Sequence, residues 1–95
     1  MIVETCTFTL VPGTADADFL AADRRVQTEL VPNQPGFLRR TTAHRDGRWL
    51  VVTLWATEED AARFADVAAR HPLAAAFERY VTPDSTRADR YDTLD

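Results

Sequence analysis

The 95-residue chain has no lysine, one cysteine, three glycines and no long apolar run. Its single cysteine, Cys6, excludes an internal disulfide. No apolar stretch approaches the roughly 20 residues that a membrane-spanning helix needs. The eleven basic residues are outnumbered by fifteen acidic ones, and the formal net charge of −4 argues against a nucleic-acid-binding protein. We therefore expect one globular domain, residues 1–95, that binds neither nucleic acid nor a membrane.

The sequence also lacks the usual signatures of a metal site or a nucleotide site. Its only histidines, His44 and His71, stand apart, and no His-x-x-Glu or Cys-x-x-Cys spacing occurs. The three glycines are scattered singly, so there is no glycine-rich phosphate loop. Met1 to Thr5 do not combine a basic with an apolar segment as a secretory signal does. We therefore expect a cytoplasmic protein without a metal or a cofactor.

Periodicity and turn residues predict four strands and two helical regions. Alternating β-branched residues predict strands over 2–11, 37–44, 49–56 and 86–94. Apolar residues at helical spacing predict helices over 14–31 and over 58–69, with a second helical stripe over 72–80. Residues 57–60 resemble a capping box, and Asp46-Gly47 is typical of a two-residue hairpin turn. The order β-α-β-β-α-β predicts a ferredoxin-like α+β fold, with a four-stranded antiparallel sheet and the helices on one face.

The strand predicted at 49–56 is apolar on both faces, although helices can cover only one side of the sheet. One face carries three aliphatic side chains, which we place beneath the helices: Leu50, Val52 and Leu54. The other face carries both tryptophans and a valine: Trp49, Val51 and Trp55. Left exposed, this second face would form a patch that monomers rarely show. We therefore expect a homodimer packed through Trp49, Val51 and Trp55. The alternative is a monomer with a half-exposed sheet.

Three polar side chains are candidates for chemistry. His71, before Pro72, suits general-base catalysis near neutral pH, and the alternative is that it caps the following helix. If Asp46-Gly47 forms the turn, His44 pairs with Trp49 on the dimer face, or lies exposed at the hairpin tip. The same register places Arg39 beneath the helices, where it would bind an acidic or phenolate ligand or form a structural ion pair.

Aromatic side chains could line a ligand pocket, although aromatic residues at such spacing more often belong to the hydrophobic core. The candidates for ligand binding are Trp55, Phe64, Phe77 and Tyr80. Cys6 lies on an apolar face with no base nearby in the sequence, so we expect an inert, buried thiol.

Several short segments together resemble one protein family. They are Pro35-Gly36-Phe37-Leu38, Leu54-Trp55-Ala56-Thr57, Glu58-Glu59-Asp60-Ala61, His71-Pro72 and Phe77. In this order, over residues 2–94, they resemble the antibiotic biosynthesis monooxygenase-like family. The resemblance implies a dimeric α+β barrel built from ferredoxin-like halves. Members of that family include cofactor-free oxygenases of aromatic polyketides and quinols, haem-degrading enzymes and proteins without a known activity.

Departures from the family's motifs narrow the expected function. Haem-degrading members use an Asn, a Trp and a His where this chain has Cys6, Phe64 and Phe77, so haem degradation is not expected. Polyketide oxygenases pair the tryptophan that corresponds to Trp55 with an Asn and a Tyr, which are Val51 and Ala61 here. We expect a barrel that binds a small aromatic ligand. As an enzyme it would be a cofactor-independent monooxygenase of a phenol, quinol or polyketide-like substrate. The alternative is a non-catalytic binding or accessory protein.

Overall fold

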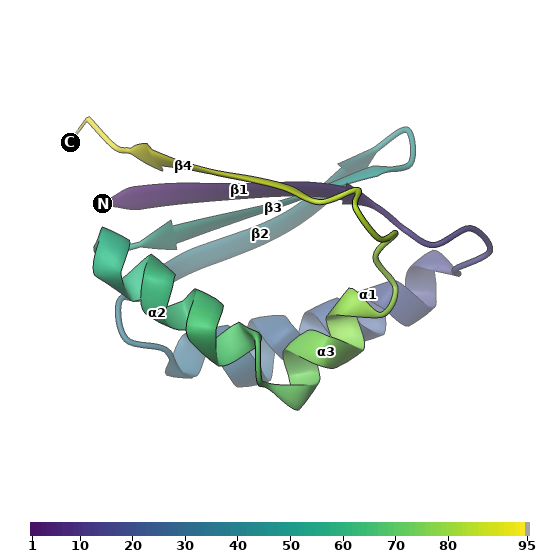
Figure 1. Cartoon of the computed structure of the whole chain (residues 1–95), viewed down its shortest axis with the longest axis horizontal. Coiled ribbons are helices and arrows are strands. Elements are labelled where there is room, and N and C mark those ends of the chain that lie inside the picture. The colour runs from purple at the N-terminus through teal and green to yellow at the C-terminus, as the bar shows by residue number, and fades with distance from the viewer. Residues whose placement is uncertain (95) are drawn as a thin grey trace.

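The computed structural model describes residues 1–94, which form a four-stranded sheet covered on one face by helices (Figure 1). The strands are β1 (Ile2–Thr9), β2 (Phe37–Arg45), β3 (Arg48–Trp55) and β4 (Arg87–Asp92). The helices are α1 (Asp16–Arg25), α2 (Glu58–Ala68) and α3 (Pro72–Glu78). The helix α1 continues into a π-helical turn, η1 (Val26–Leu30), and a 3-10 turn, η2 (Val31–Asn33). All strand pairs are antiparallel in the order β2-β3-β1-β4, which confirms the predicted ferredoxin-like α+β fold.

Local sequence signals form the turn and the helix start that they predict. Asp46 and Gly47 both adopt positive φ, +51° and +79°, as a type I′ hairpin turn requires. The Thr57 hydroxyl accepts a hydrogen bond from the Asp60 backbone N–H at 3.1 Å and so caps the first turn of α2. Within residues 1–94, no helix is both long and apolar enough to cross a membrane.

The predicted faces of β3 are reversed in the structure. Trp49, Val51 and Trp55 are buried beneath the helices, so the prediction that they form the dimer face is wrong. The three aliphatic residues that alternate with them are only partly buried and lie on the open face: Leu50, Val52 and Leu54. The reversal follows from the pairing of β3 with β1. That pairing sets Phe8 opposite Trp49, and both side chains enter one core.

The register of the β2–β3 hairpin was predicted correctly near the turn. His44 lies opposite Trp49, and Arg40 lies opposite Thr53. A bulge at Leu38, between Phe37 and Arg39, shifts the register and brings Phe37 opposite Trp55.

The largest core side chains gather toward the two ends of the helix-facing side of the sheet. One buried cluster contains Phe8, Phe19, Trp49, Val51 and Val81, and another contains Ile2, Trp55 and Ala61. Between the clusters, the central strands present smaller or polar side chains to the helices: Glu4, Cys6 and Thr53. Because these side chains fill less volume than the aromatic rings beside them, a cavity remains between the sheet and the helices.

Candidate functional site

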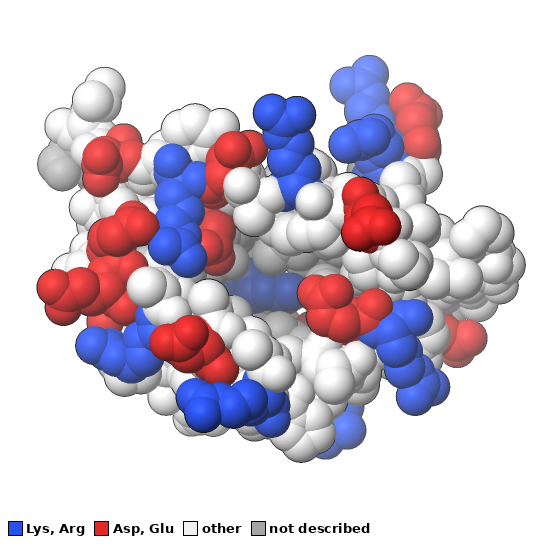
Figure 2. Space-filling model, viewed as in Figure 1, with Lys and Arg blue, Asp and Glu red and all other residues white. Residues whose placement is uncertain are grey.

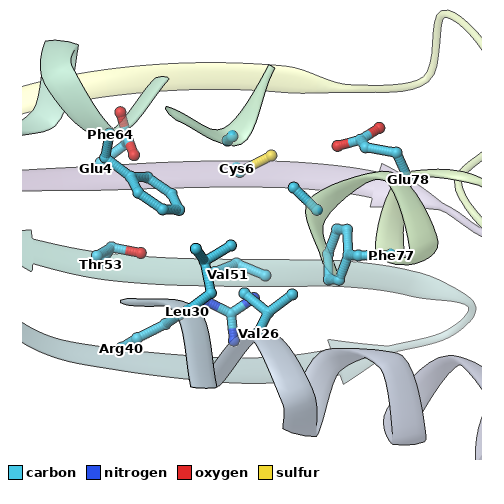
Figure 3. Close-up of a pocket in the computed structure, with 12 residues that line it drawn as sticks. Glu4, Cys6, Val26, Leu30, Arg40, Val51, Thr53, Phe64, Phe77 and Glu78 are labelled. Atoms are coloured by element: carbon cyan, nitrogen blue, oxygen red, sulfur yellow. The ribbon is translucent and has the colours of Figure 1, made fainter. Parts of the chain in front are cut away.

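The cavity has a volume of about 160 Å³ and is formed by the middle of the sheet, α2, α3 and η1. Its apolar walls come mainly from Val26 and Leu30 of η1, Phe64 of α2, and Phe77 of α3 (Figure 3). Its polar lining residues are Glu4, Cys6, Arg40, Thr53 and Glu78. In Figure 2 this side of the molecule is hollowed, with basic atoms deep in the hollow and acidic side chains around it. The site therefore combines apolar walls with a few charged groups, the usual composition of a small-molecule site.

A buried ion pair holds the arginine of the cavity in place. The Arg40 Nη2 atom lies 2.8 Å from Asp23 Oδ1, and the two side chains are only 5% and 11% exposed. Arg40 Nη1 also donates hydrogen bonds to Gln27 Oε1 at 3.1 Å and to Thr42 Oγ1 at 3.3 Å. The Arg40 guanidinium carbon lies 5.8 Å from the centre of the Phe77 ring. These contacts fix a positive charge against the apolar wall of the cavity.

The carboxylate of Glu4 is neutralised by an arginine from the neighbouring strand. Arg90 of β4 donates from Nε to Glu4 Oε2 at 2.8 Å, and from Nη1 to Glu58 Oε1 at 2.9 Å. The same guanidinium thus ties β1 and β4 to the first turn of α2. Hydrogen bonds to these two glutamates raise the pKa of Arg90 above its usual value. Glu4 is therefore an ion-paired carboxylate at the edge of the cavity.

Glu78, the last residue of α3, differs from Glu4 in its surroundings. No arginine or histidine nitrogen of residues 1–94 lies within 4.0 Å of its carboxylate. Figure 3 shows this carboxylate turned toward the cavity, facing the sulfur of Cys6. Partial burial there raises the pKa of the Glu78 carboxyl above its ordinary value of 4.5. Although the Glu78 residue is largely exposed to solvent, its carboxyl is consequently a somewhat stronger base than a glutamate with the ordinary pKa.

The Cys6 thiol lies among the charged groups of the cavity. Its pKa is raised first by burial, then by the negative charges of Glu78 and Glu4, while Arg40 opposes the rise. The thiol is therefore protonated at neutral pH, but it is only partly buried and lies beside charged groups, not on the apolar face that the sequence predicts.

The structure brings together only part of the predicted set of site residues. Phe64 and Phe77 both line the cavity. Trp55 is fully buried behind Phe64, with ring centres 5.1 Å apart, and does not line the cavity. Its indole Nε1 has no hydrogen-bond partner among residues 1–94. Tyr80 packs against the cluster around Phe8, and the Arg79 guanidinium covers its ring.

The three predicted polar side chains lie away from the cavity. The Nδ1 atom of His71 accepts a hydrogen bond from the Leu73 backbone N–H at 3.1 Å, which is the helix-capping alternative. His44 is exposed and packs on Trp49 near the hairpin turn, with ring centres 4.5 Å apart. Arg39 is exposed beside Leu54 on the open face, so its placement beneath the helices is corrected.

Sequence reasoning missed three of the charged residues that line the cavity: Glu4, Arg40 and Glu78. The signal for Arg40 was the hairpin pairing, because Arg40 shares a face with Thr42 and His44, opposite Thr53, Val51 and Trp49. Because the faces of the sheet are reversed relative to the prediction, Arg40 and not Arg39 lies beneath the helices. No group of three or more His, Cys, Asp or Glu side chains in residues 1–94 is arranged to hold a metal ion.

Comparison with known proteins identifies the fold. No family model matches the chain, and no curated protein matches it. Among solved structures, SnoaB, a cofactor-independent oxygenase from Streptomyces nogalater, is 20% identical with a TM-score of 0.79, covering 99% of this chain and 93% of that one. A candidate antibiotic biosynthesis monooxygenase from Caulobacter crescentus is 18% identical with a TM-score of 0.81, covering 99% and 90%. A similar candidate from Nitrosomonas europaea is 17% identical with a TM-score of 0.76, covering 100% of both chains. The chain therefore has the fold of the antibiotic biosynthesis monooxygenase-like proteins, as the sequence resemblance implies.

Proposed function

We propose that the cavity binds a small aromatic phenol or quinol, and that the protein oxygenates this ligand without a cofactor. The observation that carries the proposal is one largely apolar cavity lined both by a fixed cation, Arg40, and by a carboxylate, Glu78, that forms no ion pair within residues 1–94. Aromatic walls suit the ring of such a ligand, and the charged groups suit its hydroxyl. The fold shared with SnoaB, a cofactor-independent oxygenase, supports the same reaction class.

The reaction needs only a base, an anion-stabilising group and molecular oxygen. Loss of the hydroxyl proton leaves the electron pair on the substrate as a phenolate, which is electron-rich enough to reduce oxygen. A phenol then loses a ring hydrogen and gains one oxygen atom to become a quinone. The second oxygen atom leaves as water with the two hydrogens that the phenol has lost. Arg40 would stabilise the negative charge that develops on the ligand.

Non-catalytic binding of a similar ligand is the second candidate function. Two observations favour it. The cavity is smaller than the roughly 300 Å³ at which typical ligand sites begin, and neither histidine lines it.

Oxygen uptake with a panel of one-ring phenols and hydroquinones separates the two candidates. For the oxygenase we expect uptake above the rate in buffer and a quinone product that carries one oxygen atom more than the substrate, with water and not hydrogen peroxide as the second product. Saturable binding without uptake would instead support the binding protein, and the absence of both would contradict the proposed site. Ala74→Leu should fill the cavity and abolish binding, because Ala74 lines it. Ala75→Leu, on the exposed side of the same helix, is the matched control.

The open face of the sheet supports a homodimer, through the face opposite to the one predicted. This open-face patch consists of Val3, Leu50, Val52, Leu54 and Tyr91, and Tyr91 is 56% exposed. Each large apolar side chain buried there would contribute roughly 1.5–3 kcal/mol. Sedimentation should show a dimer at micromolar concentration. Val52→Arg should convert it to a monomer, and Ala62→Arg on the exposed side of α2 should not. A wild-type monomer would refute the dimer.

A further inference from the structure

We infer that the ligand is a single-ring phenol, and that Glu78 is the group that accepts its hydroxyl proton. This inference deepens the proposed function and rests on it. It assigns the base to a residue at the end of α3, whereas the sequence pointed to His71 at the start of that helix.

The size of the cavity limits the ligand to about one ring. An engineered apolar cavity of about 150 Å³ in another protein encloses benzene. The present cavity has nearly the same volume, about 160 Å³, but it is open to solvent on one side; its apolar walls are Phe64, Phe77, Leu30 and Val26. A ligand of three fused rings would leave most of its apolar surface outside these walls and would gain little from binding.

Only one of the two cavity carboxylates is free to take a proton. Glu4 is engaged by the Arg90 guanidinium at 2.8 Å, so its carboxylate already has a cationic partner. Glu78 has no cation within 4.0 Å in residues 1–94, and burial favours its neutral form. Two carboxylates whose surroundings differ in this way take different roles. Glu4 helps to hold the fold, and Glu78 takes the proton.

The groups around Glu78 set the direction of the transfer. Cys6 and Glu4 of β1 and Arg40 of β2 line the same cavity, and Asp23 of α1 holds Arg40. The adjacent Arg79 side chain lies over the Tyr80 ring, with 5.4 Å between the guanidinium carbon and the ring centre. Among residues 1–94, Arg40 of the sheet is therefore the only basic side chain that lines the cavity.

The proton transfer is balanced within the site. The ligand O–H bond breaks, the proton forms a bond to a Glu78 carboxylate oxygen, and the electron pair stays on the ligand oxygen. The net charge of the site is unchanged, while the negative charge moves from the rim onto a ligand that shares the cavity with Arg40. The attraction of that cation favours the phenolate.

The test compares phenol with its methyl ether, anisole, which has the same ring and no hydroxyl proton. Calorimetric titration at neutral pH should show that Glu78→Gln weakens phenol binding roughly tenfold or more, the usual effect of losing a hydrogen bond to a charged group. Anisole binding should not change. Glu59→Gln, which alters an exposed glutamate of α2, is the matched control and should bind both ligands like the wild type.

Each other outcome refutes a defined part of the inference. Equal weakening of phenol and anisole by Glu78→Gln, or no weakening of either, would refute Glu78 as the acceptor and leave the proposed ligand site standing. Binding of a three-ring hydroxyarene by the wild type as tightly as phenol would refute the single-ring ligand. Absence of wild-type binding for phenol, anisole and larger hydroxyarenes would refute the proposed function, and the inference with it.

Discussion

Removing the charge of Asp23 should strongly destabilise the fold. Asp23→Asn preserves the shape of the side chain but leaves Arg40 without a counter-ion, although Arg40 is 5% exposed and 2.8 Å from the carboxylate. A guanidinium stays protonated even when buried, so the charge cannot be relieved by loss of a proton. With charge centres about 4 Å apart and an effective dielectric constant of about 20, the lost attraction is about 4 kcal/mol. Loss of one partner of a buried ion pair costs about 3–5 kcal/mol in other proteins.

Urea unfolding followed by tryptophan fluorescence measures this loss. A domain of this size has a total stability of about 5–15 kcal/mol, so the substitution should remove a large share of it. Asp66→Asn, on the exposed side of α2, is the control and should stay within about 0.5 kcal/mol of the wild type. A loss below about 1 kcal/mol for Asp23→Asn would refute the reasoning.

A second variant keeps the prediction testable if Asp23→Asn does not fold. The double substitution Asp23→Leu with Arg40→Met replaces the ion pair by apolar side chains and leaves no charge buried. Such exchanges are often neutral or stabilising. The double variant should therefore be more stable than Asp23→Asn, and its failure to fold would show that the pair is needed for more than charge compensation.

Three further results are expected. Glu78→Gln should stabilise the protein at neutral pH. A carboxyl whose pKa is raised in the folded state contributes stability below its ordinary pKa of 4.5, and this contribution is lost as the pH rises through the folded-state pKa. A gain in stability that persisted in acid would contradict this. Gly36→Ala should lower the free energy of unfolding by about 1–3 kcal/mol, because a Cβ atom there would overlap the Asp60 side chain. Gly13→Ala is the control, since its Cβ atom would meet nothing and only the positive φ is unfavourable. Equal losses in thermal unfolding would refute the contact with Asp60. The Cys6 thiol should react with Ellman's reagent more slowly than free cysteine, and Glu78→Gln should accelerate it by removing a negative charge; an unchanged rate would contradict that coupling.

Sequence periodicity predicted the elements well because each carries strong local signals. The hairpin is the clearest case, since Asp46-Gly47 specifies its turn and the turn fixes the pairing of His44 with Trp49. The capping threonine, Thr57, marks the start of α2 in the same way. The helix predicted over 14–31 was correct in position, although its last part is π-helical and 3-10.

The faces of the sheet could not be predicted, because both faces of β3 are apolar. Strands β1 and β3 are not joined by a turn, so local sequence does not fix the register that pairs Ile2 with Trp55 and Phe8 with Trp49. The large rings of Phe8, Trp49 and Trp55 fill the space beneath the helices, and the smaller side chains of Leu50 and Val52 face outward. The error carried over to the candidate site, because the arginine beneath the helices depends on the same choice of face.

The charged form of Glu78 lowers the stability of the fold, whereas the other charged groups at the cavity raise it. Asp23 and Glu4 each compensate an arginine, so removing either should lower stability. Glu78 compensates none among residues 1–94, and its partial burial penalises the charged form. Glu78→Gln should therefore raise stability while it lowers affinity for a phenol. A residue that only supported the fold would lower both when it is removed. A gain in stability together with a loss of phenol affinity is therefore the result expected if Glu78 serves ligand binding and not the fold.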